Sequence, residues 1–538
     1  MEKKIDTRLL ATLGGGILFS YLFWMEYQAL NLLVYSVFLL TFIALDRSME
    51  KTKKMLLAGA AHLISAILAV TLHTDLTIVT WYISLAVFTG YTHFQAIRSI
   101  FTAVGGALLQ FFSTPVNIIR GLISAHFGSV SFQPVLRPLA IVTIPLFLLL
   151  LFTLLYGNAS ATFARYLDQI GNAFSIVFAG VFDFLFADLS FLRFLHLMLG
   201  IMFTGAVFIG FRDKALERAE LACTDQLQRK KRNRESTNIG QEMLEILAGT
   251  FINKKMALKT ESTIAIACFI MLNLLLLSFN VVDLNTVWRN AFANPAGANL
   301  SAELHDGTNA LIASIILAML VIIYFFNGNL NFYSRNRTIR ILAYIWMAQN
   351  AFLVLSVLVR DLNYIAAMGL TYKRIGVIVF LLLCSAGLVT VYIKVAARKT
   401  IFYLLRVNTL IWYCLLLTFS FVNWDVLIVQ YNIANRNSIQ LDLDHLQSMS
   451  DKTLPLLWAH KEILRKYEPV YDEIVIEPPY GGGHSRAITK RVPRLKSALE
   501  ENLRNRITAF QKRYAKQSWQ SYNYADQKTW EYFKTAKK

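Results

Sequence analysis

The sequence has few charged residues and few cysteines for its length. Asp, Glu, Lys and Arg make up 16% of its 538 residues, whereas about 25% is typical of a soluble domain. A soluble chain of this length would form several domains with charged surfaces, so the composition argues against that class. The four cysteines show neither CxxC nor metal-binding spacing, which argues against a zinc site and a disulfide framework.

Motifs of catalysis and of cofactor binding are missing as well. The stretch Gly481-Gly-Gly-His-Ser-Arg486 is rich in glycine, but it lacks the GxxxxGK[ST] spacing of a phosphate-binding loop. We interpret it as a linker. The sequence therefore predicts no catalytic, cofactor-binding or metal-binding residues, and no cofactor.

Long apolar runs dominate what is present, and 56% of all residues are hydrophobic. About 20 apolar residues cross a bilayer as a helix, and a backbone in lipid must satisfy its own hydrogen bonds. The sequence predicts an all-α fold, a polytopic transmembrane bundle of about 11 spans followed by a mostly helical soluble domain at the C-terminus. The predicted spans are Leu9–Trp24, Ala29–Leu45, Met55–His73, Thr77–Phe94, Leu139–Tyr156, Phe191–Phe211, Thr263–Asn280, Ala310–Phe326, Leu342–Val359, Ile375–Ile393 and Val407–Asn423.

The lysine and arginine residues between the runs favour one orientation. With the N-terminus inside, the inner segments hold 28 Lys and Arg residues and the outer loops hold 5. Positive residues are enriched in cytoplasmic loops. We therefore expect the N-terminus in the cytoplasm and, because the number of spans is odd, the C-terminal domain outside it.

These spans divide the chain into four regions. Residues 1–211 form an N-terminal membrane region of six spans, and 212–262 form a basic cytoplasmic loop. Residues 263–431 form a second membrane region of five spans, and 432–538 form the soluble domain. Two apolar but interrupted segments, Ile97–Phe112 and Thr162–Leu185, have helical spacing; packing against the bundle, a position on the membrane surface and a re-entrant segment all remain open.

Several elements can be expected in the C-terminal domain. A short helix over Leu441–Gln447 precedes a second helix that starts at Asp451 with Ser450 as its cap. Tyr471–Glu477 is expected to be extended, and Val492–Gln517 to form a basic amphipathic helix.

Membrane lipids are the expected partners. The net charge of +19 includes the run Arg229, Lys230, Lys231, Arg232 and Arg234 in the cytoplasmic loop. This run is interpreted either as a contact for anionic lipids or as a topology signal on a solvated helix. We expect an envelope partner for the C-terminal domain, and we expect no nucleic acid there.

Four stretches carry a resemblance to a known family. They read YGNASATF from Tyr156, DLNYIAAMGLTYKR from Asp361, YNIANRNSIQLDLDHLQSMSDKTLPLL from Tyr431 and SWQSYNYADQKTW from Ser518. Together they resemble a family of bacterial multi-pass membrane proteins that is catalogued only as a domain of unknown function. The resemblance implies the fold and a place in the inner membrane, and it implies no activity. The residues that match its motifs are Asp361, Tyr364, Gly369, Leu370, Thr371, Arg374, Asn432, Leu441, Asp442, Leu446 and Ser450.

The stretch from Asp361, which lies between two late spans, has a physical interpretation of its own. Gly369 can take the left-handed conformation that ends a helix, and Thr371 can cap the helix that follows. Arg374 would then lie in the first turn of that helix, within reach of Asp361. A fixed corner between two helices and a ligand site are both consistent with the pattern.

Three functions are compatible with the sequence. The first is a non-enzymatic membrane sensor or scaffold that presents the C-terminal domain outside the cytoplasm. The second is a transporter, although the predicted spans hold only sparse polar residues, such as His62, His196, Asn273 and Gln349. The third is an envelope enzyme that modifies lipids or glycans, with Glu26 or Asp183 as its acid or base.

Overall fold

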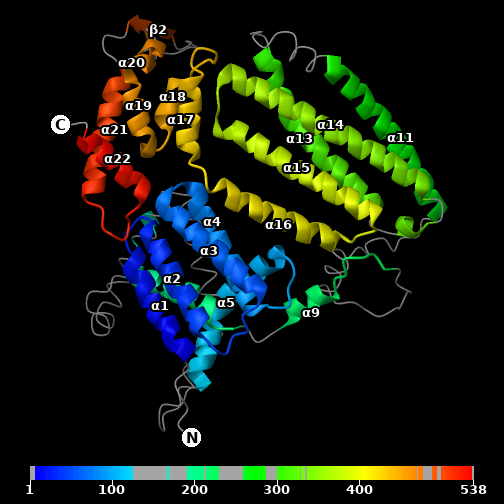
Figure 1. Cartoon of the computed structure of the whole chain (residues 1–538), viewed down its shortest axis with the longest axis horizontal. Helices are drawn as coiled ribbons and strands as arrows, with labels where there is room; N and C mark the ends of the chain where they lie inside the picture. The colour runs from blue at the N-terminus through cyan, green and yellow to red at the C-terminus, as the bar shows by residue number, and fades with distance from the viewer. Residues whose placement is uncertain are drawn as a thin grey trace. The chain divides into compact units, whose positions relative to one another are not determined.

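The computed structural model (Figure 1) is almost entirely helical. The residues that the structure describes are 7–124, 165, 166, 169, 191–210, 214–228, 258–285, 300–326, 329–333, 336–468, 471–476, 488–493 and 498–535. The chain divides into two compact units. The first comprises Met1–Cys223, Tyr413–Ser420 and Ser518–Asn523, and the second comprises Thr224–Trp412, Phe421–Gln517 and Tyr524–Lys538.

The first unit is a bundle of apolar helices. Its helix α1 packs along α8 because glycines allow the two backbones to approach. A Cβ atom on Gly15 or Gly16 would overlap Thr204 or Ile201 of α8. The helices of this unit are α1 (Thr7–Phe23), α2 (Leu30–Leu45), α3 (Lys53–Thr71), α4 (Asp75–His93), α5 (Ile100–Ser124), α8 (Phe191–Phe208) and α9 (Ala215–Ala222).

Polar side chains inside the first unit pair with each other. The Tyr35 hydroxyl shares a hydrogen bond of 2.9 Å with Thr204, which joins α2 to α8. Nδ1 of the fully buried His62 lies 3.0 Å from the Ser84 hydroxyl, which joins α3 to α4. Hydrogen bonds of this kind hold helices together in an apolar environment.

The second unit begins with a layer of long helices. Figure 1 shows α11, α13, α14 and α15 side by side in green to yellow. Gln349 of α14 donates a hydrogen bond of 2.9 Å to Asn273 of α11, so the polar residues of these two helices also pair with each other. The elements are α11 (Leu258–Asp283), α13 (Leu300–Phe325), η2 (Asn329–Phe332), α14 (Arg337–Met368), α15 (Tyr372–Ala396) and α16 (Ile401–Phe419), of which the residues from Tyr413 belong to the first unit.

Helix α14 extends nine residues beyond the span predicted over Leu342–Val359 and ends at Met368. The charged residue Arg360, which was expected to begin a loop, instead forms an ion pair with Asp283 at the end of α11. The Ser356 hydroxyl donates to the same carboxylate. Because the charge is neutralised against a neighbouring helix, it does not end α14.

Five helices in the described part of the chain are long and apolar enough to cross a membrane, by length and composition. Outward-facing residues of α11 support this assignment, since Met271, Leu274 and Leu275 are 70, 62 and 68% exposed. The predicted span Thr77–Phe94 forms α4, which lies outside this set, and the predicted span Leu139–Tyr156 lies outside the described residues. The five helices cover Lys53–Thr71, Ser262–Asp283, Arg337–Met368, Tyr372–Ala396 and Ile401–Phe419, with shorter apolar helices at Thr7–Phe23, Leu30–Leu45, Leu192–Phe208 and Ala310–Phe325.

The remaining elements of the second unit are short helices and one hairpin. The strand predicted at Tyr471 is confirmed as β1, which pairs antiparallel with β2. The helix predicted over Val492–Gln517 is wrong at its start, because β2 takes its first residues and α21 begins only at Ala498. These elements are α17 (Trp424–Ala434), α18 (Leu443–Ser448), η3 (Asp451–Thr453), α19 (Leu454–Ala459), α20 (Lys461–Leu464), η4 (Arg465–Tyr467), β1 (Tyr471–Ile476), β2 (Ile488–Pro493), α21 (Ala498–Ala515) and α22 (Tyr524–Thr535).

The carboxylate of Asp451 joins η3 to α21. Asp451 forms ion pairs with Arg506 at 2.9 Å and with Arg513 at 3.0 Å, both on α21. Ser450 occupies the capping position before η3, as expected from the sequence, but its side chain makes no capping hydrogen bond. The start of the helix is thus fixed by packing and by Asp451 rather than by the serine.

Candidate functional site at the α14–α15 turn

The turn between α14 and α15 requires a glycine. Gly369 has a φ of +81°, and its N–H donates a hydrogen bond of 2.8 Å to the carbonyl of Ile365, which ends α14. A Cβ atom at this position would lie 2.5 Å from Oδ1 of Asn432. Both the backbone conformation and the close approach of Asn432 therefore exclude a larger residue.

Asn432 of α17 binds the backbone of the next residue in the turn. Its Oδ1 accepts a hydrogen bond of 2.6 Å from the N–H of Leu370, and its Nδ2 donates one of 2.9 Å to the carbonyl of Leu370. Asn432 is 5% exposed. The stretches that begin at Asp361 and Tyr431 therefore meet at the buried side-chain amide of Asn432, which forms hydrogen bonds with both the N–H and the carbonyl of Leu370.

Arg374, in the first turn of α15, folds back over the end of α14. Its Nη1 donates to the carbonyl of Met368 at 3.0 Å and to that of Gly369. The guanidinium lies over the ring of Tyr364, 4.2 Å from the centroid. A cation is favourable here because the last carbonyls of a helix carry partial negative charge.

Two expectations for this turn differ from the structure. Thr371 precedes α15 but makes no capping hydrogen bond. Arg374 uses the helix carbonyls rather than an ion pair with Asp361, whose buried Oδ2 has no hydrogen-bond partner in the described part of the chain. The buried carboxylate of Asp361 lies in α14, behind the turn.

The segment after α17 completes the site. The N–H of Gln440 donates a hydrogen bond of 2.9 Å to the carbonyl of Ala367 in α14. Asp442 then caps α18, because its Oδ1 accepts a hydrogen bond of 2.9 Å from the N–H of His445. Backbone and side-chain bonds therefore fix both walls of the site.

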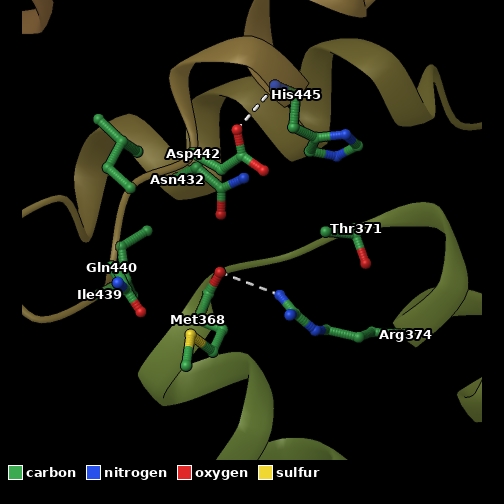
Figure 2. Close-up of a pocket in the computed structure, with 9 residues that line it drawn as sticks. Met368, Thr371, Arg374, Asn432, Ile439, Gln440, Asp442 and His445 are labelled. Carbon is green, nitrogen blue, oxygen red and sulfur yellow. Dashed lines mark hydrogen bonds between the residues drawn. The ribbon is translucent and has the colours of Figure 1, made fainter. Parts of the chain in front are cut away.

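These segments enclose a pocket of about 360 Å³. Figure 2 shows Thr371 and Arg374 on the α14–α15 side, and Asp442 and His445 on the opposite ribbon. A pocket of this volume is at the small end of the range for small-molecule sites. Its lining consists of Met368, Thr371, Arg374, Asn432, Ile439, Gln440, Leu441, Asp442 and His445.

The eleven residues singled out from the sequence fall into three groups. Thr371, Arg374, Asn432, Leu441 and Asp442 line the pocket. Tyr364, Gly369 and Leu370 shape the turn behind it. The other three lie away from it: Asp361 inside α14, Leu446 in α18 and Ser450 before η3.

Sequence reasoning missed four residues of the lining. Met368, Ile439 and Gln440 carry no pattern that would distinguish them from other residues near a helix end. His445 did carry one, because it stands three positions after Asp442, the spacing of a helix cap and its backbone donor. That spacing would have identified Asp442 as a helix cap and predicted that His445 lies next to it.

A second feature of interest lies in the first unit, at the α1–α2 turn. Oε2 of Glu26 accepts hydrogen bonds from the hydroxyls of Ser518 and, at 2.6 Å, Ser521. The carbonyls of Tyr522 and Gln520 accept hydrogen bonds of 3.0 and 2.9 Å from the N–H groups of Leu30 and Asn31. The segment Ser518–Asn523 therefore supplies acceptors to the start of α2, where helix N–H groups have no partner of their own.

This arrangement assigns Glu26 to the docking of Ser518–Asn523. The other acid named for an enzyme, Asp183, lies outside the described residues, as does the basic run from Arg229 to Arg234. Within the described part of the chain, no group of three or more His, Cys, Asp or Glu side chains could hold a metal ion.

Comparison with known proteins gives one family match. Residues 34–459 match the family described as Domain of unknown function (DUF4153). No curated protein and no solved structure matches the chain. The matched range contains both motifs that meet at the pocket, as well as the stretch from α2 to α19.

Proposed function

The chain belongs to the DUF4153 family, described as a domain of unknown function, and from its geometry we propose that it is a non-enzymatic membrane sensor or scaffold presenting its C-terminal domain outside the cytoplasm. In this proposal about 11 helices cross the inner membrane, the N-terminus is cytoplasmic, and membrane lipids surround the spans. The pocket beside the α14–α15 turn is the sensing site.

Contacts among the inner segments support this alternation of the spans. In the first unit, Arg8 at the N-terminus forms an ion pair of 2.8 Å with Asp46 in the α2–α3 loop. In the second unit, Asp225 forms an ion pair of 2.9 Å with Arg406 at the start of α16. Loops that contact each other must lie on the same side of the membrane. Each of these ion pairs joins two segments that the alternation of spans assigns to the cytoplasm, so the contacts agree with that assignment.

Contacts of the C-terminal domain support its outer position in the same way. The segment Ser518–Asn523 binds the α1–α2 turn through Glu26. Asn432 binds the α14–α15 turn through Leu370. The lysine and arginine counts assign both turns to the outside, and the two contacts belong to different compact units, so each supports the position by itself.

The observation that carries the sensing role is the hydrogen-bonded pair of Asn432 and Leu370 at the edge of the pocket. A ligand in the pocket touches the turn between two membrane helices, at Thr371 and Arg374, and the first elements of the C-terminal domain, at Asp442. It therefore changes the contact between these parts by its own interactions. Coupling of this kind needs a ligand that binds one arrangement better than another.

Cysteine labelling tests the orientation. In a chain whose four native cysteines are replaced, we expect Asp444→Cys to react with a membrane-impermeant maleimide in intact cells. Lys53→Cys, at the first residue of α3, is the matched control and should react only after permeabilisation. The opposite pattern would contradict the proposal.

Photo-cross-linking tests the scaffold role. With a cross-linker at position 444 in intact cells, we expect one envelope component to be captured in an amount that saturates with its supply. Capture that only follows the abundance of surrounding proteins would remove the scaffold role while leaving the orientation intact.

A further inference from the structure

The pocket at the α14–α15 turn contains charges of both signs. Arg374 is its cation and Asp442 is its anion, and Figure 2 shows them on opposite ribbons with open space between them. Within the described residues, no ion pair joins them. Two opposite charges that face one cavity without bonding to each other suit a ligand that also carries one charge of each sign.

Both charged groups keep hydrogen-bonding capacity toward the cavity. Within the described residues, only Nη1 of Arg374 donates to protein acceptors, so Nε and Nη2 remain for a ligand. The guanidinium is held in place by the ring of Tyr364. A planar guanidinium with two nitrogens available binds a carboxylate or a phosphate through two parallel hydrogen bonds.

On the opposite wall, Asp442 and His445 offer acceptors. Oδ1 of Asp442 caps α18, and its Oδ2 accepts no hydrogen bond from the part of the chain that the structure describes. Nε2 of His445 is buried and has no hydrogen-bond partner among the residues that the structure describes. A buried nitrogen without a partner destabilises the protein unless something else binds it, and an ammonium group supplies three donors.

The volume limits the ligand to a small molecule. About 360 Å³ holds a group of amino-acid size. Met368, Ile439 and Leu441 add apolar surface to the lining, which suits a short aliphatic linker.

We propose that this pocket binds a small zwitterion, with its oxyanion on Arg374 and its ammonium group on Asp442 beside His445. The shared chemistry is an oxyanion and an ammonium group separated by a short aliphatic chain. A phosphoethanolamine headgroup of a lipid and a free amino acid both provide it. This inference rests on the proposed function, because it takes the pocket to be the sensing site.

Calorimetry on the full-length protein in detergent tests the ligand class without variants. We expect O-phosphoethanolamine or glycine to bind at least roughly tenfold more tightly than inorganic phosphate and ethanolamine, each of which offers one charge only. If neither zwitterion exceeds those two probes, the proposal is overturned.

Matched substitutions then locate the site. Asp442→Asn keeps an oxygen for the cap of α18 and removes the charge, and it is expected to weaken zwitterion binding at least roughly tenfold. Asp444→Asn, in the first turn of α18 but outside the pocket, should bind like the wild type. Arg374→Gln and Lys373→Gln form the corresponding pair on the opposite wall. Equal binding by Asp442→Asn, Arg374→Gln and the wild type would refute the assignment.

The lipid environment distinguishes the two sources. If the ligand is a headgroup, protein in nanodiscs of phosphatidylethanolamine should no longer bind added O-phosphoethanolamine, whereas protein in phosphatidylglycerol nanodiscs should. If it is a free amino acid, glycine should bind equally in both. Because these assays use purified protein, their failure removes the ligand class, whereas the labelling of position 444 separately decides the orientation.

Discussion

Asn432 and Leu370, 62 positions apart, form two hydrogen bonds in which the side-chain amide of Asn432 pairs with the N–H and the carbonyl of Leu370, as a neighbouring backbone would. The pair fixes α17 against the end of α14 in one register. It also joins the two walls of the pocket, because Arg374 and Asp442 lie on the segments that the pair connects.

Loss of this pair is expected to destabilise the second unit. Asn432→Leu has a similar volume but leaves the N–H and the carbonyl of Leu370 buried without partners, at a cost of roughly 2–4 kcal/mol. Thermal denaturation in detergent should show a clearly lower midpoint. Asn437→Ala, at an exposed position of the same connection, should change the stability by less than about 0.5 kcal/mol. Equal midpoints for the two variants would contradict the role given to Asn432.

Two glycines, one in the α14–α15 turn and one inside α15, provide a matched test of the backbone. Gly369→Ala introduces a Cβ atom 2.5 Å from Asn432 Oδ1 at a φ of +81°, so we expect a loss of roughly 2–3 kcal/mol. Gly376→Ala lies in α15 with nothing within 4 Å of its Cβ position, and should be neutral or stabilising by up to about 1 kcal/mol. Only the midpoint of Gly369→Ala should therefore fall, and an equal decrease in both variants would argue against the geometry of the turn.

Removal of the Glu26 carboxylate is expected to release the segment Ser518–Asn523. Glu26→Ala eliminates the acceptor of both serine hydroxyls, a loss of roughly 1.5 kcal/mol. Hydrogen exchange of residues 518–523 should then become about tenfold faster. Glu50→Gln, at an exposed side chain in the α2–α3 loop, is the control. Unchanged exchange in Glu26→Ala would show that the backbone contacts alone hold the segment.

The Arg8–Asp46 pair should make stability depend on acidity. Burial by itself raises the pKa of Asp46, but hydrogen bonds from Ser48 and Arg8 and the charge of Arg8 outweigh it and hold this pKa below its ordinary value. Folding therefore favours the ionised carboxylate. The resulting stability is present above the unfolded pKa of about 4 and is lost as the pH falls through the lower pKa of the folded state.

The measurement is a comparison of midpoints for wild type and Asp46→Asn at several pH values. The wild type should be more stable at pH 7, and the difference should shrink below about pH 4. Ser48→Ala should show a smaller difference of the same sign. A difference that grows on acidification would mean that the carboxylate is protonated more readily in the folded state.

Much of the helical layout could be predicted because the apolar runs are long and the physics of a lipid environment is simple. The runs beginning at Leu9 and Ala29 became α1 and α2, with the turn at Glu26 where it was expected. The end of α14 was not predicted, because Arg360 looks like a loop residue until Asp283 is known to lie beside it. Charge in a sequence marks a boundary only when no partner neutralises it.

The candidate site was predictable in its parts and not in its assembly. Gly369 and Arg374 were assigned to a helix corner from local patterns alone. That Asn432 would bind Leu370 depends on tertiary packing over 62 positions, which no local pattern records. The hydrogen bonds from Ser518 and Ser521 to Glu26 join residues that lie even further apart in the sequence. Nothing in a sequence indicates which acceptor a serine hydroxyl will bind.

The docking of Ser518–Asn523 has a consequence for biosynthesis. The α1–α2 hairpin is synthesised well before its partner segment, since the Ser521 hydroxyl that accepts from the N–H of Tyr27 lies 494 positions later. The acceptors for Leu30 and Asn31 arrive at the same late stage. A chain that stops before Ser518 therefore lacks the acceptors for the N–H groups of Tyr27, Leu30 and Asn31, so the defect lies at the start of α2, far from the missing residues in sequence.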